Sequence, residues 1–92
     1  MIKTFSEKHT EKLWQEKTAR RWKSIQAVAL RKLDQLNKAK SLFDLTSPPH
    51  NRLETLRGEW KGYHSIRIND QWRIIFIWEK GNAYEVAIKD YH

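Results

Sequence analysis

The apolar residues of this chain follow two different periods, one in each half. Between about Arg20 and Lys40 there is no Gly or Pro, and apolar residues recur every three to four positions: Trp22, Ile25, Ala29, Leu33 and Leu36. That spacing places them on one side of an α-helix. Beyond Ser47-Pro48-Pro49, which ends any helix, apolar and polar residues alternate as they do in half-buried β-strands. The pattern predicts a helical first half and a sheet in the second half.

Shorter signals flank the main helix. Residues 1–5 alternate weakly and predict a short strand. Ser6 followed by the acidic Glu7 is typical of the N-cap and first turn of a short helix. Ser41 and Asp44, three residues apart, predict one further capped turn after the main helix.

The second half contains three predicted strands, at 63–68, 72–78 and 83–89. Asn69-Asp70, residues that tolerate the positive φ of a tight hairpin turn, and Gly81-Asn82 predict tight turns between them, so that consecutive strands run antiparallel. The middle strand is apolar on both faces, which predicts a central position in the sheet. The residues expected to point inward are His64, Ile66 and Ile68 from the first strand and Tyr84, Val86 and Ile88 from the last.

The order of these elements predicts the fold class. A chain of 92 residues has room for one domain. We therefore expect residues 1–92 to form a single α+β domain: an N-terminal strand, two helices, and an antiparallel β-meander sheet with the helices packed on one face.

The charge adds a partner to this picture. The chain carries 18 Lys and Arg against 11 Asp and Glu, a formal charge of +7, and residues 1–46 hold most of the excess. Such a surface favours a polyanion, and an RNA or ribosome contact is expected from the basic residues of the predicted helix: Arg20, Arg21, Lys23, Arg31 and Lys32. The alternative is a solvated helix face without a partner.

Several functional classes lack their motifs. There is no Cys, and the four His form no metal-binding pair, so no metal site and no cofactor are expected. A G-x-S-x-G elbow and a P-loop are absent. The longest apolar run, Ile74 to Trp78, is far shorter than a membrane span, and the opening residues lack an apolar stretch of signal-peptide length, which predicts a cytoplasmic protein without membrane contact.

A set of polar residues in the second half carries the candidate chemistry: Glu54, Arg57, Arg67, Arg73, Tyr91 and His92. Arg73 is unusual, because a guanidinium in an otherwise apolar strand is costly unless it is paired or faces a cleft. An anionic group is expected beside it. A structural ion pair with Glu54 or Asp90 and an anionic substrate both satisfy that expectation.

Together these residues resemble a known family. Residues 51–58 (NRLETLRG), 62–68 (GYHSIRI), 71–76 (QWRIIF) and the terminal Asp90-Tyr91-His92 resemble the HigB-type toxins of the RelE/ParE superfamily of bacterial toxin–antitoxin systems. The resemblance extends over essentially the whole chain. It implies a RelE-like fold and a ribosome-dependent mRNA endoribonuclease that inhibits translation and arrests growth. It also implies a co-encoded, HigA-like helix-turn-helix antitoxin that represses the operon, so that operator DNA is contacted only through the antitoxin.

The resemblance also implies roles for individual residues. Arg73 matches the arginine that faces the scissile phosphate, Arg57 matches a basic position, and Asp90, Tyr91 and His92 match the C-terminal active-site run. Where several HigB toxins have a His, this chain has Glu54, which resembles the general base of YoeB-type toxins. We count Glu54, Arg57, Arg73, Tyr91 and His92 as catalytic, and Arg67 and Asp90 as RNA-binding.

Two other functions remain open at this point. A ParE-type toxin of the same fold acts on gyrase through a protein contact and needs no acid–base pair. A non-catalytic RNA- or ribosome-binding module would explain the charge alone.

Overall fold

The helical half precedes a four-stranded sheet in the computed structural model, which describes residues 1–90. The first half contains α1 (Lys8–Glu16), the 3₁₀ turn η1 (Arg20–Trp22), α2 (Gln26–Lys38) and the 3₁₀ turn η2 (Leu42–Thr46). The second half contains η3 (Pro49–Asn51), β1 (Glu54–Thr55), η4 (Gly58–Trp60), β2 (His64–Arg67), β3 (Trp72–Glu79) and β4 (Asn82–Asp90).

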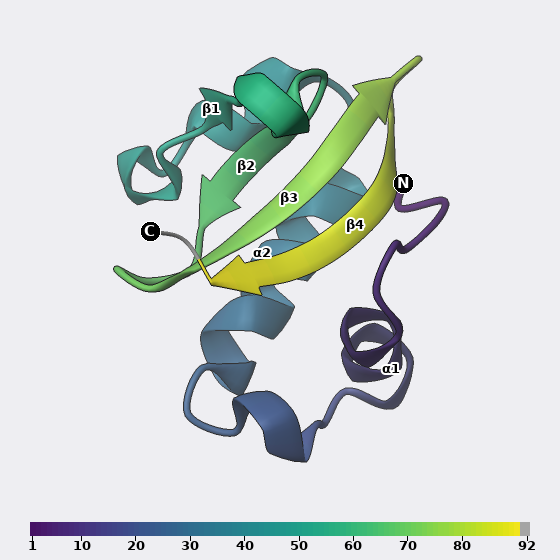
Figure 1. The fold of residues 1–92 in the computed structure, drawn as a ribbon, viewed down its shortest axis with the longest axis vertical. Helices are drawn as coiled ribbons and strands as arrows, with labels where there is room; N and C mark the ends of the chain where they lie inside the picture. The colour runs from purple at the N-terminus through teal and green to yellow at the C-terminus, as the bar shows by residue number, and fades with distance from the viewer. Residues whose placement is uncertain (91–92) are drawn as a thin grey trace.

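The sheet is antiparallel, in the order β1-β2-β3-β4. In Figure 1, α2 passes behind the sheet, and the front face carries no helix except the short η4. The buried apolar residues of α1, α2 and the back of the sheet form the core: Leu13, Ala29, Leu33, Leu36, Ile66, Ile74, Phe76 and Val86 are all fully buried. The predicted α+β architecture is confirmed, including the central position of β3.

The register of the strands decides which polar residues share a face of the sheet. Ile66 pairs with Ile74, and both lie in the core behind the sheet. Arg73 pairs with Arg67 on one side and with Lys89 on the other. Paired residues of antiparallel strands point to the same face, and neighbours along a strand alternate. These three cations therefore belong to the face opposite α2, which we call the free face.

The first residues pair with the sheet only through two isolated parallel bridges, Ile2 with Ala83 and Phe5 with Val86. The predicted N-terminal strand is thus reduced to an extended segment. It still supplies backbone hydrogen bonds to β4, such as Lys3 N–H to the Ala83 carbonyl (2.8 Å). It therefore covers the outer edge of β4, which would otherwise expose unpaired backbone groups.

The N-cap of α1 is Glu7, and the prediction of Ser6 was wrong. The Glu7 carboxylate accepts the backbone N–H groups of His9 and Thr10, each at 2.8 Å, and the Thr10 hydroxyl at 2.7 Å. The Ser6 hydroxyl instead donates to the Glu85 carbonyl. The Thr10 hydroxyl oxygen accepts the Ile88 N–H (3.0 Å), so this cap also fixes α1 to β4.

The main helix begins at Gln26, six residues later than the apolar spacing predicted. Residues 20–22 form η1 instead, although Trp22, Ile25, Ala29, Leu33 and Leu36 are all buried as expected. The Gln26 side-chain oxygen accepts the Ala19 N–H (3.0 Å). This bond folds the incoming chain over the start of α2, so the helix cannot extend backward. The predicted turn at Ser41 and Asp44 is confirmed, with both capping-box interactions present.

The two hairpin turns differ in detail from the prediction. Lys80 and Gly81 have φ of 51° and 80°, and Asn82 already pairs with Glu79, so this turn lies one residue earlier than expected. At the other turn, Asn69 acts through its side chain: its oxygen accepts the N–H groups of Gln71 (2.9 Å) and Trp72 (2.8 Å). Neither Asn69 nor Asp70 adopts a positive φ.

Tyr84 does not point into the core, which corrects another prediction. The register of β3 and β4 shifts between Ile75 and Ile77, and Glu85 has a φ of 53°, both marks of a β-bulge. One extra residue reverses the alternation. Tyr84 therefore pairs with Ile77 on the free face, while Ala83 is buried in the core. Val86 and Ile88, beyond the bulge, point inward as predicted.

Candidate active site on the free face of the sheet

Arg73 lies at the centre of the polar set. It is 5% exposed, and its Nε donates to the Ser65 hydroxyl (2.9 Å). Its Nη2 donates to the Arg52 carbonyl (2.5 Å), and its Nη1 lies 3.9 Å from Glu54 Oε1. The expected acidic neighbour is therefore Glu54. These contacts fix the plane of the guanidinium, which stays charged at any physiological pH.

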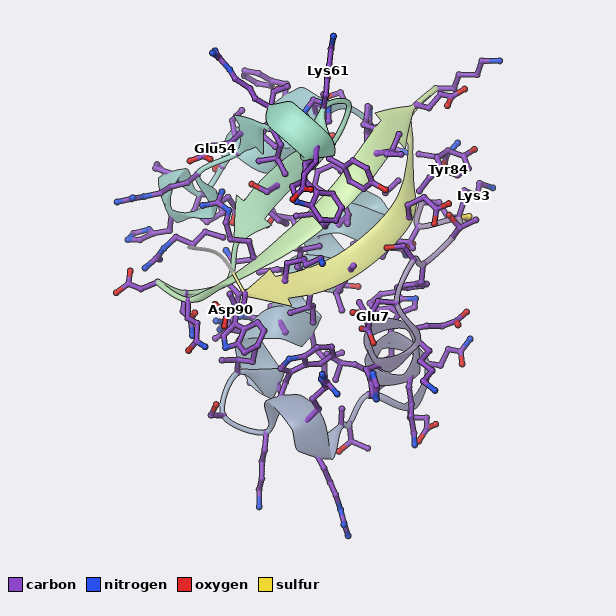
Figure 2. All side chains as sticks on the ribbon, in the orientation of Figure 1. Lys3, Glu7, Glu54, Lys61, Tyr84 and Asp90 are labelled. Atoms are coloured by element: carbon purple, nitrogen blue, oxygen red, sulfur yellow. The ribbon has the colours of Figure 1, made fainter. Side chains whose placement is uncertain are left out.

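Glu54 reaches this position because residues 54–55 form a short edge strand. Glu54 pairs with Ser65 and Thr55 with His64 across the sheet, a strand that the sequence pattern did not reveal. The Glu54 side chain is 45% exposed, and Figure 2 shows it at the outer edge of the sheet, in β1. A carboxylate placed beside a fixed cation and open to solvent is available to accept a proton from a bound ligand.

A hollow of about 470 Å³ lies on the free face, and its lining includes Lys89, the strand partner of Arg73. Trp60 of η4 and Arg57, the residue before η4, line one side of this hollow. The lining also includes Ile75 from β3 and Lys89 and Asp90 from the end of β4. The Asp90 carboxylate accepts the Gln71 side-chain N–H (3.1 Å). The structure thus brings Arg57 and Asp90 into one hollow, beside the strand that carries Arg73.

Sequence reasoning missed four contributors: the Ser65 hydroxyl, the Arg52 carbonyl, Lys89 and Trp60. Ser65 was recognisable, because it occupies the free-face phase of a strand and faces across from β3. The Arg52 carbonyl is a backbone atom placed by a residue with φ of 44°, which no side-chain pattern signals. Lys89 and Trp60 lie 29 residues apart and meet only through the sheet register and η4.

Arg67 belongs to both the free face and a second basic hollow. It pairs across the strands with Arg73, and its guanidinium contacts Asp70. It also lines a hollow of about 350 Å³ with Arg31, Lys32 and His50. Lys32 turns partly inward, donating to the buried Asn51 (2.5 Å), and burial together with the nearby Arg31 and Arg67 charges lowers its pKa.

The remaining basic residues lie apart from the free face. Arg20 and Arg21 line a hollow of about 530 Å³ with His9, Lys12 and Glu16, at the junction of α1 and η1. Arg21 also lies over the Trp22 ring, with 5.8 Å between Cζ and the ring centroid. Lys23 is exposed just after η1. These three residues form a surface separate from Arg73 and Glu54.

His64 packs as the alternation predicted. Its ring lies 5.9 Å from that of Phe76, its Nδ1 is 3.1 Å from the Thr55 hydroxyl, and burial lowers its pKa. Among residues 1–90, no three His, Asp or Glu side chains are grouped as a metal site. Nor is any helix in that range both long and apolar enough to cross a bilayer. Tyr91 and His92 lie outside the described residues, so their predicted roles remain predictions.

The free face therefore combines several cations with exposed carboxylates: Glu54 lies beside Arg73, and Glu59 and Asp90 line the hollow. A buried, oriented guanidinium and two exposed cations suit a phosphodiester, whose negative charge increases when a nucleophile attacks the phosphorus. The carboxylate of Glu54 is placed to accept a proton beside that charge.

Comparisons with known proteins give one consistent result. A family model described as "RelE-like toxin of type II toxin-antitoxin system HigB" matches residues 3–92. Toxin HigB-1 of Vibrio cholerae is 40% identical over 85 residues, or 90% of each chain. Endoribonuclease HigB of Proteus vulgaris is 42% identical over 41 residues, or 45% of each chain.

Solved structures share the fold. The YoeB–YefM complex of Staphylococcus aureus contains a chain with a TM-score of 0.63 and 22% identity, covering 100% of this chain and 95% of that one. YafQ of E. coli has a TM-score of 0.59 and 18% identity, covering 98% of this chain and 91% of that one.

Proposed function

We propose that this chain cleaves mRNA while the message is being translated on the ribosome, because it belongs to the HigB family of RelE-like toxins from type II toxin–antitoxin systems. The family match confirms two expectations from the sequence: that the chain is a HigB-type toxin, and that its activity is that of an endoribonuclease. The dependence on the ribosome and the roles of individual residues are part of the proposal. The 92 residues act as one toxin domain.

The observation that carries this proposal is the pair of Glu54 and Arg73. Glu54 Oε1 lies 3.9 Å from a guanidinium that is itself held by Ser65 and Arg52. A purely structural pair gains little from an acid that is 45% exposed. A proton acceptor beside a phosphate-binding cation benefits from that exposure, because the substrate must reach both groups.

RNA supplies its own nucleophile in the proposed reaction. Glu54 takes the proton from a 2′-hydroxyl, the 2′-oxygen attacks the adjacent phosphorus, and the bond from phosphorus to the 5′-oxygen breaks. His92 returns a proton to the departing 5′-oxygen. The products are a 2′,3′-cyclic phosphate and a 5′-hydroxyl. Arg73 and Arg57 stabilise the charge on the phosphorane, and Tyr91 stacks on a base or orients the phosphate.

Ribosomal RNA is the proposed partner of the basic surfaces away from this site. Arg20, Arg21 and Lys23 supply one such surface near α1, and Arg31 and Lys32 supply another, which Arg67 connects to the free face. Asp90 is proposed to contact the message from the end of β4. No metal or cofactor takes part, since a 2′-hydroxyl, an acid and a base complete the reaction.

The second partner is an antitoxin, as for any type II toxin. We propose that it is a co-encoded, HigA-like helix-turn-helix protein, and that operator DNA is contacted only through it. The toxin then acts in the cytoplasm, where translating ribosomes are found.

Primer extension on a reporter mRNA tests the proposal. Expression of the chain without an antitoxin is expected to produce cuts in a translated reporter and none in a copy whose start codon is removed. His92→Gln is expected to reduce cleavage by about 10²- to 10⁴-fold, the usual effect of losing a general acid. Intact messages together with inhibited gyrase supercoiling would identify a ParE-type toxin instead.

A further inference from the structure

Trp60 is distinguished from the other tryptophans by its surroundings. Within residues 1–90, Trp22 is buried in the core and Trp14, Trp72 and Trp78 pack against it, whereas Trp60 does neither. It sits at the end of η4 over the free face of the sheet and lines the hollow that contains Arg57, Lys89 and Asp90. A large aromatic ring kept out of the core is available to a ligand.

The Trp60 ring is held in a fixed orientation. The backbone N–H of Trp60 donates to the Arg57 carbonyl (3.3 Å), and its backbone carbonyl accepts the Tyr63 N–H (3.0 Å). The Tyr63 ring meets the indole edge to face, with centroids 5.3 Å apart and planes at 86°. Because neighbouring groups set the position of the indole, little ordering is required when a flat ligand stacks on it.

A cation occupies the region over this ring. The Lys89 ammonium lies 4.7 Å from the Trp60 ring centroid, although the lysine is exposed. Such contacts are weak at exposed sites, so a stacking ligand is able to displace the ammonium. Lys89 is also the register partner of Arg73, so a displaced ammonium remains beside the proposed phosphate site.

We propose that Trp60 stacks on a nucleobase of the message, next to the phosphate held by Arg73, and that Lys89 moves from the ring to the RNA backbone when the base enters. Ile75, two residues beyond Arg73 on β3, is buried and contributes an apolar part of the lining. A flat ring with a movable cation is the combination by which proteins bind single-stranded RNA. The inference rests on the proposed ribonuclease function and adds the site that positions a base.

A matched control lies elsewhere in the chain. The Lys17 ammonium lies 3.4 Å from the Trp14 ring centroid, which is the same type of contact. That pair lies in and just after α1, where Trp14 packs against the core, and it is not part of the free face. If the contact between Lys89 and Trp60 served only stability, the two pairs would respond alike to substitution.

The first experiment measures kcat, KM and cleavage positions on ribosomes carrying a short defined message. Trp60→Ala is expected to lower kcat/KM by about 10- to 100-fold, mostly through KM, as loss of one stacked base does. It is also expected to broaden the choice of cleavage position. Trp60→Phe retains a stacking face and is expected to stay within about threefold of wild type, as is Trp14→Phe.

A binding measurement separates this inference from the proposed function. The probe is a trinucleotide with a 2′-deoxy group at every sugar, which cannot be cleaved, and the signals are the tryptophan indole N–H resonances, with that of Trp60 assigned from Trp60→Phe. Millimolar probe is expected to shift the Trp60 signal and leave the Trp14 signal in place.

Two results would overturn the inference. The first is that the wild type cleaves and Trp60→Ala keeps the same KM and the same cleavage positions. The second is that the probe does not shift the Trp60 signal. A wild type that cleaves nothing would refute the proposed function, while the Trp60 signal would still decide the binding question. If Trp60→Ala is unfolded by thermal melting, the titration of the folded wild type decides.

Discussion

Glu54→Gln is the change that separates chemistry from stability most sharply. The amide has the size of the carboxylate and preserves the backbone pairing of residue 54 with Ser65. It removes the negative charge beside Arg73 and the ability to accept a proton. A catalytic base and a structural ion-pair partner therefore predict different consequences for the same substitution.

The structure sets both magnitudes. The Glu54 side chain is 45% exposed and 3.9 Å from Arg73 Nη1, and such pairs contribute about 0–1 kcal/mol to the free energy of unfolding. The guanidinium keeps its hydrogen bonds to Ser65 and Arg52, and the amide oxygen of Gln is still an acceptor for Nη1. Loss of a general base costs about 10²- to 10⁴-fold in rate. We expect a nearly unchanged melting temperature and cleavage lowered by that factor.

The assay is single-turnover cleavage of a message bound to ribosomes, with thermal unfolding followed by circular dichroism. Glu79→Gln is the matched control, since Glu79 is an exposed acid at the opposite end of β3 from Arg73, pairs with Asn82 and does not line the hollow. Cleavage by Glu54→Gln within about threefold of wild type, far less than the loss of a base requires, would refute its role as the base.

Three further changes test other parts of the molecule. Arg73→Ala is expected to abolish cleavage and also to lower the free energy of unfolding by about 2–4 kcal/mol, because the buried Ser65 hydroxyl and the Arg52 carbonyl lose their donor; an unchanged melting temperature would contradict this. Hydrogen bonds from Thr10 and His9 outweigh burial, which acts in the opposite direction, and lower the pKa of Glu7 from 4.5 to about 2. The stability that this carboxylate contributes is present above pH 4.5 and is lost as the pH falls toward 2. Glu7→Gln is therefore expected to be about 1–2 kcal/mol less stable than wild type at neutral pH, with the difference closing in acid. A difference that does not change with pH would contradict this role of Glu7. Replacing Arg20, Arg21 and Lys23 by Gln is expected to weaken ribosome sedimentation and reduce its salt slope by up to about three, and an unchanged slope would mean that this surface is only solvated.

Periodicity predicted the parts of the fold that depend on burial. The stripe from Trp22 to Leu36, the inward Ile66 and Ile68 of the first strand and the two apolar faces of β3 follow from which side chains must leave water, and the structure buries them accordingly. The errors occurred where specific hydrogen bonds decide. Glu7 replaced Ser6 as N-cap because its longer side chain reaches two N–H groups and a hydroxyl, and Gln26 started α2 late by binding the Ala19 N–H.

Tyr84 shows a second limit of reading a strand from its pattern. One unpaired residue near Glu85 reverses every inward and outward assignment on one side of it, and an alternating sequence contains no mark of where that residue lies. The same limit applied to the site. Lys89 and Trp60 come together through the register of β3 with β4 and the position of η4, which are properties of the folded sheet.

The structure also changes the question that Arg73 raised. From the sequence, a structural ion pair and a phosphate-binding residue were competing explanations. In the folded chain, Nε and Nη2 tie Ser65 in β2 to the backbone at Arg52, just before β1, while Nη1 faces Glu54. Structural bonds on one side of a guanidinium fix the direction of its other side, and a fixed direction is what makes a charge effective at a transition state. Structural and catalytic roles for Arg73 therefore support each other. A toxin built this way is expected to lose cleavage with Arg73→Lys even if it folds, because an ammonium cannot reproduce the planar set of donors.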